Sequence, residues 1–452
     1  MESARSAGAA AMTLAAVACR LVMASAALAV AAGSIAALPQ HSAESSVGVG
    51  SCASSLCHGA IETWTDSNVL QNEYITWSRR DKHARSYETL FNERSKEIVA
   101  KMTLGVPAHQ SALCLDCHAH NPPAAQRTAG FQITDGVACE ACHGGAGRWL
   151  STHVERGATH AKNVARGMYP TNDDEARARL CVSCHVGNRD KFVTHKMMAA
   201  GHPRMSFELD TFTQIAPPHF RIDAGWQRRK GSWDGVRAWA IGQAVVAQEM
   251  LLFLQGPRGR DGLFPELVLF DCHSCHHSMG EKRNTAARVG AGPGFVRLND
   301  ASLLMLKQIA RRAVPAEADA FSAQVMRLHK AVAAGEDALL QAHAVEQRIA
   351  AMIPRIRERR FAGDDVRGML FGLIDDGLAG QYADYQGAEQ AVMAIQSVAD
   401  LMGRQKLVRT APLKTTMRKL VAAVAYDEKY RPSEFQQALR EFRSSVEWGM
   451  IK

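Results

Sequence analysis

The sequence predicts a mainly α-helical protein in two parts, and three observations lead to that prediction. Aromatic residues make up only 6% of the 452 residues, and the alternation of polar and apolar residues that strands require is scarce. Ten of the 11 cysteines lie between Cys52 and Cys275, and none lies beyond. Residues 300–452 instead repeat apolar residues at the helical period. We therefore expect a cysteine-bearing domain of short helices and loops, followed by a C-terminal α-helical bundle.

The N-terminal residues have the pattern of an export leader. Arg5 and Arg20 precede an apolar stretch at residues 21–38, in which Ser34 and Ala36 are small residues placed for cleavage. This pattern predicts a signal peptide and a periplasmic protein. The alternative is an uncleaved leader, because a stretch of about 18 residues is just long enough to cross a membrane and would anchor the protein there. We expect residues 1–39 to comprise the signal peptide, or N-terminal anchor, and the start of a linker.

Four cysteine pairs with the spacing Cys-x-x-Cys-His carry the chemistry. Two thiols at this spacing can form thioethers to the two vinyl groups on one edge of a porphyrin, and the next imidazole can reach the iron. Zinc sites and disulfides also use paired cysteines, but neither requires a histidine directly after the second cysteine. Because the chain has only 18 histidines, so many coincidences are not expected by chance. The predicted haem c sites are Cys114, Cys117 and His118; Cys139, Cys142 and His143; Cys181, Cys184 and His185; and Cys272, Cys275 and His276.

A fifth motif precedes these four and has a longer loop. Cys52, Cys57 and His58 keep the order of cysteine, cysteine and histidine, with four residues between the cysteines. A longer loop still presents two thiols to two vinyl groups if it bulges, and five haems would then use every cysteine outside the leader. We interpret this motif as a working variant and expect five haem c groups, and four at least. The alternative is a four-haem protein in which Cys52 and Cys57 are free or bridged.

The sixth ligand of each iron decides what the haem does. A second histidine gives a low-spin carrier, a methionine raises the potential, and an open position permits chemistry. Five histidines would suffice, so no haem is forced to be five-coordinate, and none is prevented from it. Met197, Met198 and Met205 are expected to pack rather than to ligate. Ten histidines outside the motifs lie between residues 60 and 300: His83, His109, His120, His153, His160, His195, His202, His219, His273 and His277.

Three of these histidines have a predicted local structure. Residues 72–91 have the pattern of an amphipathic helix, which would present His83 rigidly. His195 and His202 are seven residues apart and would share one face of a helix that Pro203 ends.

Several stretches of the chain resemble the cytochrome c-554/c-prime family of multihaem cytochromes. They are DGVACEACHGGAGRWL (135–150), CVSCHVGNRDKFVTH (181–195), AAGHPRMSFEL (199–209) and LFDCHSCHH (269–277), and the resemblance covers residues 48–280. It implies stacked haems in close-packed pairs and periplasmic electron transfer. Two departures, the additional haem site and the longer first motif, leave the haem-by-haem assignment of ligands open. By this resemblance the distal ligands are His83, His153, His195, His202 and His219, with His160 in reserve.

The chain divides into a pentahaem cytochrome c domain at residues 40–290 and a C-terminal helical domain at residues 300–452. Residues 234–256 predict one long buried helix, ended by Gly256 and Pro257. The Gly-rich residues 288–295 predict the boundary.

The C-terminal domain is expected to form an antiparallel helical bundle packed on the haem domain. Asp300 is placed to cap its first helix and Pro432 to begin its last. His329 and His343 are expected to be ordinary helix residues, and the basic run at residues 355–360 a solvated helix end rather than a dock for an acidic partner. The predicted helices are residues 300–313, 319–335, 336–353, 387–403 and 432–449.

The formal charge of +8 alone suggests an anionic partner such as nucleic acid. Five haems alter that charge balance, because the negative charge of their propionates exceeds the positive charge of the ferric centres. The oxidised mature protein then has a net charge of about +2. We therefore expect redox partner proteins and no nucleic acid. The sequence does not indicate whether the protein is a monomer or an oligomer.

Three functions remain in competition. The leading one is an electron carrier, and an electron-transfer protein is favoured over a catalyst. The second is a multihaem oxidoreductase with one open iron, acting on a small nitrogen or sulfur compound such as nitrite, hydroxylamine or nitric oxide. Against it, the chain has no Cys-x-x-Cys-Lys site, the usual mark of nitrite-reducing pentahaem enzymes. The third is a haem-bearing scaffold or sensor whose bundle binds a partner subunit.

Overall fold

The structure is a computed structural model that describes residues 37–65, 69–230, 233–260, 265–277 and 296–451. The leader before residue 37 and the predicted boundary at residues 288–295 lie outside the described residues. The chain divides into the units Met1–Ala37 and Leu38–Lys452, and all the described helices and strands belong to the second unit. The second unit is mainly helical, as predicted. In the part of the chain that the structure describes, no helix is both long and apolar enough to span a membrane.

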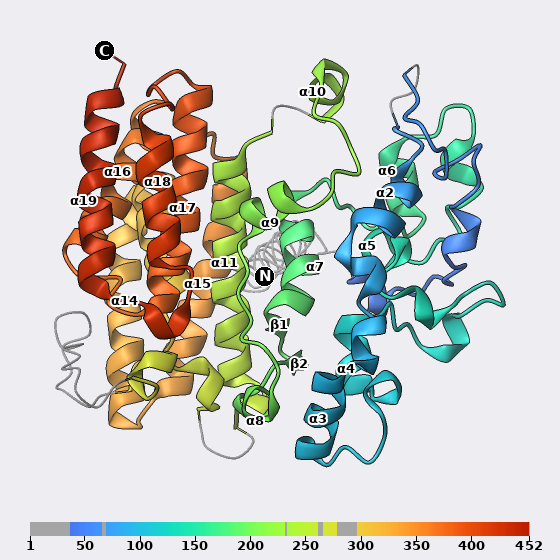
Figure 1. Ribbon diagram of the computed structural model, residues 1–452, viewed down its shortest axis with the longest axis horizontal. Helices are drawn as coiled ribbons and strands as arrows, with labels where there is room; N and C mark the ends of the chain where they lie inside the picture. The colour runs from blue at the N-terminus through green and yellow to red at the C-terminus, as the bar shows by residue number, and fades with distance from the viewer. Residues whose placement is uncertain (1–36, 66–68, 231–232, 261–264, 278–295, 452) are drawn as a thin grey trace, which may run out of the picture. The chain divides into compact units, whose positions relative to one another are not determined.

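The first half of this unit consists of short helices joined by loops and 3-10 turns, as predicted (Figure 1). A small apolar core around Tyr87, Leu90 and Leu115 supports part of it. Strands β1 (Gly187–Asn188) and β2 (Lys191–Phe192) form one antiparallel hairpin. The helices are α2 (Glu73–Arg80), α3 (Glu93–Met102), α4 (Ala112–His118), α5 (Cys139–His143), α6 (His160–Ala165), α7 (Asp174–His185), α8 (His195–Ala200), α9 (Leu209–Ile215) and α10 (Ala224–Lys230).

The single amphipathic helix predicted over residues 72–91 is wrong. Helix α2 ends at Arg80, where Asp81 adopts an extended backbone with φ −89° and ψ 129°. The Asp81 carboxylate accepts a hydrogen bond from the backbone N–H of His83 and so caps a separate 3-10 turn, Lys82–Arg85. An aspartate that bonds the backbone two residues ahead competes with helix continuation. His83 therefore lies on a capped turn.

The helical face predicted for His195 and His202 is also wrong. Helix α8 begins at His195 and ends at Ala200, because Gly201 has a φ of +125°, a conformation that L side chains rarely adopt. His202 lies beyond this break. The two rings are therefore free to face different parts of the molecule.

Helix α11 (Gly235–Gln255) confirms the prediction of one long buried helix. The Asp234 carboxylate caps its N-terminus by accepting a hydrogen bond from the N–H of Arg237, and the helix ends before Gly256. Trp239 and most of its other side chains are buried. Helix α11 contacts α7 on one side and the C-terminal helix α15 on another (Figure 1).

The C-terminal residues form a set of long helices, drawn from yellow to red in Figure 1. Pro432 begins the last helix, as predicted. Asp300 precedes the first, but the expected side-chain cap is wrong, because its carboxylate contacts Arg297 and His329 instead. The helices are α13 (Ala301–Ala313), α14 (Pro315–Ala334), α15 (Ala338–Glu358), α16 (Asp364–Leu378), α17 (Tyr385–Arg404), α18 (Leu413–Ala423) and α19 (Pro432–Gly449).

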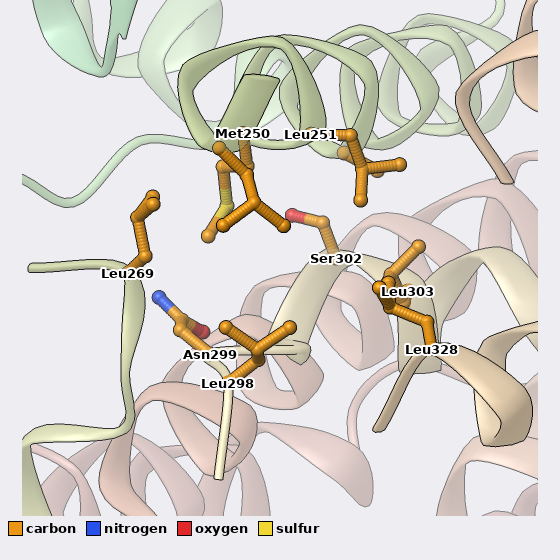
Figure 2. Close-up of a pocket in the computed structure, with 10 residues that line it drawn as sticks. Met250, Leu251, Leu269, Leu298, Asn299, Ser302, Leu303 and Leu328 are labelled. Atoms are coloured by element: carbon orange, nitrogen blue, oxygen red, sulfur yellow. The ribbon is translucent and has the colours of Figure 1, made fainter. Parts of the chain in front are cut away.

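One apolar core joins the C-terminal helices to the haem-motif half of the chain. It runs from Ala178 on α7, through α9 and α11, to Val446 on α19. A small apolar cavity of about 20 Å³ interrupts it, lined by Met250 and Leu251 of α11, Leu303 of α13 and Leu328 of α14 (Figure 2). Pockets for small molecules are on the order of 300–1,000 Å³, so this cavity is a packing gap.

Candidate haem-binding sites

The four regular motifs lie on helical turns. The second motif of the chain ends α4, the third forms α5 and the fourth ends α7. The fifth motif begins in the 3-10 turn Cys272–Ser274. Side chains three residues apart lie on the same side of a helix, so both thiols of each pair face one direction. The histidine that follows then lies beside them, which is the arrangement that haem attachment requires.

In the first motif, a bulged loop brings the histidine and the first cysteine together as in the regular motifs. The N–H of His58 donates to the carbonyl of Cys52 at 3.2 Å, just as the N–H of His276 donates to the carbonyl of Cys272 at 2.8 Å in a regular motif. The extra residues project outward, and Leu56 at the tip is 79% exposed. A Cβ on Gly59 would lie 1.9 Å from the carbonyl oxygen of Ala53, so glycine permits this return. The longer loop therefore brings its histidine back beside its first cysteine.

A second histidine faces the motif histidine in four of the five sites. Two imidazoles on opposite faces of one iron have ring centres roughly 6 Å apart, from a metal–nitrogen bond of about 2 Å on each side plus the distance from nitrogen to ring centre. The observed separations match this spacing. They are 6.3 Å for His58 and His153, 6.5 Å for His118 and His202, 5.9 Å for His185 and His83, and 6.2 Å for His276 and His195.

The remaining motif histidine, His143, lies near His219. Burial, and after it the charge of the nearby His219, lowers the pKa of His143 to about 4. His160 also affects His143, but less. The structure thus pairs four of the five histidines expected from the resemblance with different motif histidines. The fifth, His219, lies close enough to His143 to affect its charge, and its Nε2 is 4.0 Å from Oδ2 of Asp81.

Hydrogen bonds orient most of these rings through Nδ1. In metal sites the second ring nitrogen is held in this way by a carboxylate or a backbone carbonyl, which leaves Nε2 for the metal. The Nδ1 partners are Glu73 for His58 (2.9 Å), Asp81 for His83 (2.9 Å), and the carbonyls of Ser86 for His118 (3.1 Å), Leu150 for His153, Pro203 for His202 (2.8 Å) and Pro217 for His219 (2.9 Å).

Other histidines use their rings within the protein. His120 and His329 contact Ser46 and Asp300 through Nε2, at 2.9 and 3.1 Å. His273 contacts Asp427 through Nε2, and the ring of His109 stacks on Phe91. The nitrogen that a haem iron would need is therefore engaged in His120, His273 and His329.

The protonation state of the rings suits metal binding. Burial lowers the pKa of His185 to about 4 and that of His118 in the same direction, so both are neutral at pH 7, the form that binds a metal. Hydrogen bonds with Glu73 and Asp81 raise the pKa values of His58 and His83, and a carboxylate partner raises the basicity of a ligand. Sequence reasoning missed both carboxylates. The Asp-x-His spacing could have indicated Asp81, whereas Glu73 is 15 residues from His58 and gave no signal.

Neighbouring motifs lie against one another in an order that differs from the order along the chain. The Cys52 thiol contacts that of Cys139, and the Cys117 thiol contacts that of Cys184. Cys142 lies close enough to Cys181 and Cys184 for their charges to raise the pKa of its thiol. Together with burial, the larger cause, they raise this pKa to about 12. The motifs therefore follow the spatial order first, third, fourth, second.

The fifth motif continues this order beyond the second. His195, which faces His276, begins helix α8, and His202, which faces His118, lies just past its end. One short segment thus serves the second and the fifth motif.

The basic run at residues 355–360 is largely paired within the chain. Arg355 contacts Glu317, and Arg359 contacts Asp365 at 2.7 Å. Arg357 contacts Glu175 of α7 at 2.6 Å. The Arg357 pair connects the end of α15 to α7, the helix that carries the fourth motif.

The residues present fit haem c. The ring separations and the Nδ1 partners are those of two axial histidines, and all ten described cysteines are free thiols. Among the described residues, no three His, Cys, Asp or Glu side chains gather around one point as in a zinc site.

Comparison with known proteins identifies the haem-bearing segment. Residues 51–144 match the family described as cytochrome c554 and c-prime. This match begins with the long-loop motif and contains the first three motifs. No curated protein sequence and no solved structure matches the chain. Residues 51–144 therefore match a segment of the cytochrome c554 and c-prime family, and this match supports a c-type cytochrome, which implies covalently bound haem c.

Proposed function

We propose that the protein is an exported pentahaem cytochrome that passes electrons between redox partner proteins. The observation that carries this proposal is the histidine beside each motif histidine, with ring centres 5.9–6.5 Å apart in the four measured pairs. Two axial histidines make a low-spin centre suited to electron transfer.

Each part of the site has a defined task. The cysteine pairs would attach the porphyrin, and the paired imidazoles would hold the iron. Haem c supplies the one-electron chemistry when bound. Glu73 and Asp81 orient His58 and His83 through Nδ1, and the buried surroundings of His143 and His185 keep those rings neutral.

The contacts between motifs support transfer along the chain of sites. The thiols of the first and third motifs touch, as do those of the second and fourth, and one segment serves the second and fifth. Attachment points this close keep neighbouring centres within a short distance, which a carrier of single electrons requires. The first and fifth motifs are then the ends of the series.

The leader supports a periplasmic location for this carrier, with membrane attachment if the leader is not cleaved. Cell fractionation with a cytoplasmic marker tests the location. Recovery of the haem-stained protein in the cytoplasmic fraction contradicts export.

The alternative function, an oxidoreductase for a small nitrogen or sulfur compound, requires an open iron. A histidine beside every motif histidine favours the carrier instead.

Mediated coulometry of the purified holoprotein tests the proposal. We expect five electrons per chain, haem content of five by the pyridine haemochrome assay, and no turnover of nitrite or hydroxylamine by the reduced protein. Four electrons with four haems contradicts the first site, and turnover contradicts the carrier function.

A further inference from the structure

The segment that follows helix α8 carries two rings that face haem motifs. His202 faces His118 of the second motif, with ring centres 6.5 Å apart. Phe207 stacks on His185 of the fourth motif, with ring centres 5.2 Å apart. Residues 202–208 form neither helix nor strand. Irregular backbone opens more readily than helices do unless other parts of the protein contact it, so the positions of these rings depend on such contacts.

Helix α17 of the C-terminal bundle supplies several of these contacts. The two carboxylate oxygens of Glu389 lie 3.0 and 3.1 Å from Nη2 of Arg204. The same carboxylate accepts a hydrogen bond from the hydroxyl of Ser206 at 2.7 Å. The next residue, Gln390, donates to the carbonyl of Phe207 at 3.2 Å. Hydrogen bonds between charged groups are roughly twice as strong as neutral ones, so Glu389 makes the strongest of these contacts.

The side chain of Arg204 is enclosed by the bundle. Its guanidinium lies over the ring of Tyr385, 5.0 Å from the centroid, and its Nε lies 3.5 Å from Oδ2 of Asp427. The hydroxyl of Tyr385 lies 3.2 Å from Oε1 of Glu389. The side chains of Arg204 and Glu389 are only 22% and 17% exposed. Solvent and salt therefore screen this ion pair less than they screen a pair on the surface.

Arg204 is joined to the ring of His202 through one peptide bond. The Nδ1–H of His202 donates to the carbonyl of Pro203 at 2.8 Å, and that carbonyl belongs to the planar peptide unit that ends at the nitrogen of Arg204. Holding Arg204 therefore limits the direction in which this carbonyl points. On its other side, the N–H of His202 donates to the carbonyl of Met197 at 3.0 Å, which holds the backbone but not the ring.

We propose that Glu389 is a positioning residue, which keeps His202 opposite the second motif by holding Arg204 and Ser206. The proposal rests on the proposed function and deepens it, because it takes His202 as the distal ligand of the second haem. A distal histidine with weaker support leaves its iron open for a larger fraction of the time, and carbon monoxide can bind to the open form. The bundle thus keeps the second haem closed to small ligands.

The substitution Glu389→Ala tests this proposal in the holoprotein. We expect the reduced wild type to bind no carbon monoxide and the variant to bind up to one molecule per chain, with a high-spin ferric EPR signal from one haem in five. Glu389→Gln keeps an oxygen that can accept from Ser206, so it should bind less than Glu389→Ala at the same gas concentration. Glu434→Ala, which removes an exposed carboxylate of α19, should bind none.

A double variant identifies the iron that opens. His202→Ala alone removes the ring that faces His118, so it should bind one carbon monoxide per chain. Glu389→Ala combined with His202→Ala should also bind one, because both substitutions act on the same iron. Two molecules per chain in the double variant would overturn the proposal, since Glu389 would then affect a different haem.

A folded Glu389→Ala holoprotein with five haems that binds no carbon monoxide would also overturn the proposal. If that chain does not fold, Arg204→Met removes the guanidinium from the other side of the ion pair and should open the same iron; no uptake by this variant would overturn the proposal as well. The wild-type protein separates the two possible failures. Uptake by the wild type contradicts the carrier function, whereas no uptake by either the wild type or the variant contradicts only the role of Glu389.

Discussion

Glu249 of helix α11 gives a stability prediction whose sign follows from its surroundings. Its Oε1 lies 3.6 Å from Nη1 of Arg179 on α7, and its side chain is 14% exposed. Arg179 already donates to Glu175 at 2.9 Å and to Gln248 at 2.9 Å. Burial raises the pKa of Glu249 to about 7, although Arg179 acts to lower it. The shared arginine therefore compensates only part of the cost of burying this carboxylate.

The raised pKa makes the native protein less stable as the pH rises. Between pH 4.5, the ordinary pKa of this group, and about 7, the native state binds more protons than the unfolded state. The free energy of unfolding therefore falls across this window and stays lower above it. A displacement of about 2.5 pKa units at 1.36 kcal/mol per unit corresponds to at most about 3 kcal/mol.

Denaturant unfolding of the holoprotein, followed by circular dichroism at pH 4.5 and pH 8, measures the effect of Glu249→Gln. We expect the variant to match the wild type at pH 4.5 and to exceed it by up to about 3 kcal/mol at pH 8. Glu358→Gln, an exposed residue at the end of α15, should show no such pH-dependent gain. A Glu249→Gln protein less stable than the wild type at pH 8 would show instead that the ion pair with Arg179 outweighs the cost of burying the carboxylate.

Three other predictions concern the haem sites. The substitution His83→Ala removes the ring that faces His185, so one high-spin haem should appear and bind one carbon monoxide per chain, whereas His120→Ala should bind none; equal binding by both would contradict the pairing. A Cys52→Ala/Cys57→Ala chain should lose one haem by intact-protein mass, and an unchanged mass increment would show that the long-loop motif attaches none. The planes of the two imidazole rings are nearly perpendicular in the second and fourth sites, at 80° and 89°, but only 13° and 32° apart in the first and fifth. The ferric protein should therefore give two groups of low-spin EPR signals. A single group of signals would contradict this difference in ring orientation.

The sequence predicted the chemistry of the sites because haem attachment needs particular residues at particular spacings. The motifs are local, so their residue types and order could be identified directly. The same holds for helix α11 and for Pro432, where local signals agree with the tertiary structure. Residues 72–91 failed as one helix because a single aspartate side chain, Asp81, bonds the backbone ahead of it.

The resemblance implied the five distal histidines, but which of them faces which motif could not be predicted from the sequence, because the pairing depends on how distant segments meet. His83 faces a histidine about one hundred residues further along the chain, and His202 and His195 serve different motifs although they share one segment. Arg297 likewise contacts both Asp271 and Asp384, which are far apart in the sequence. Periodicity indicates which faces are buried but not which charged residues meet there.

Whether a second histidine binds every haem iron is tested by EPR and optical spectroscopy of the oxidised holoprotein, followed by exposure of the reduced form to carbon monoxide. All five haems should be low-spin when oxidised, and none should bind the gas when reduced. A high-spin ferric signal together with carbon monoxide uptake would contradict this expectation, because one iron would then lack its second histidine.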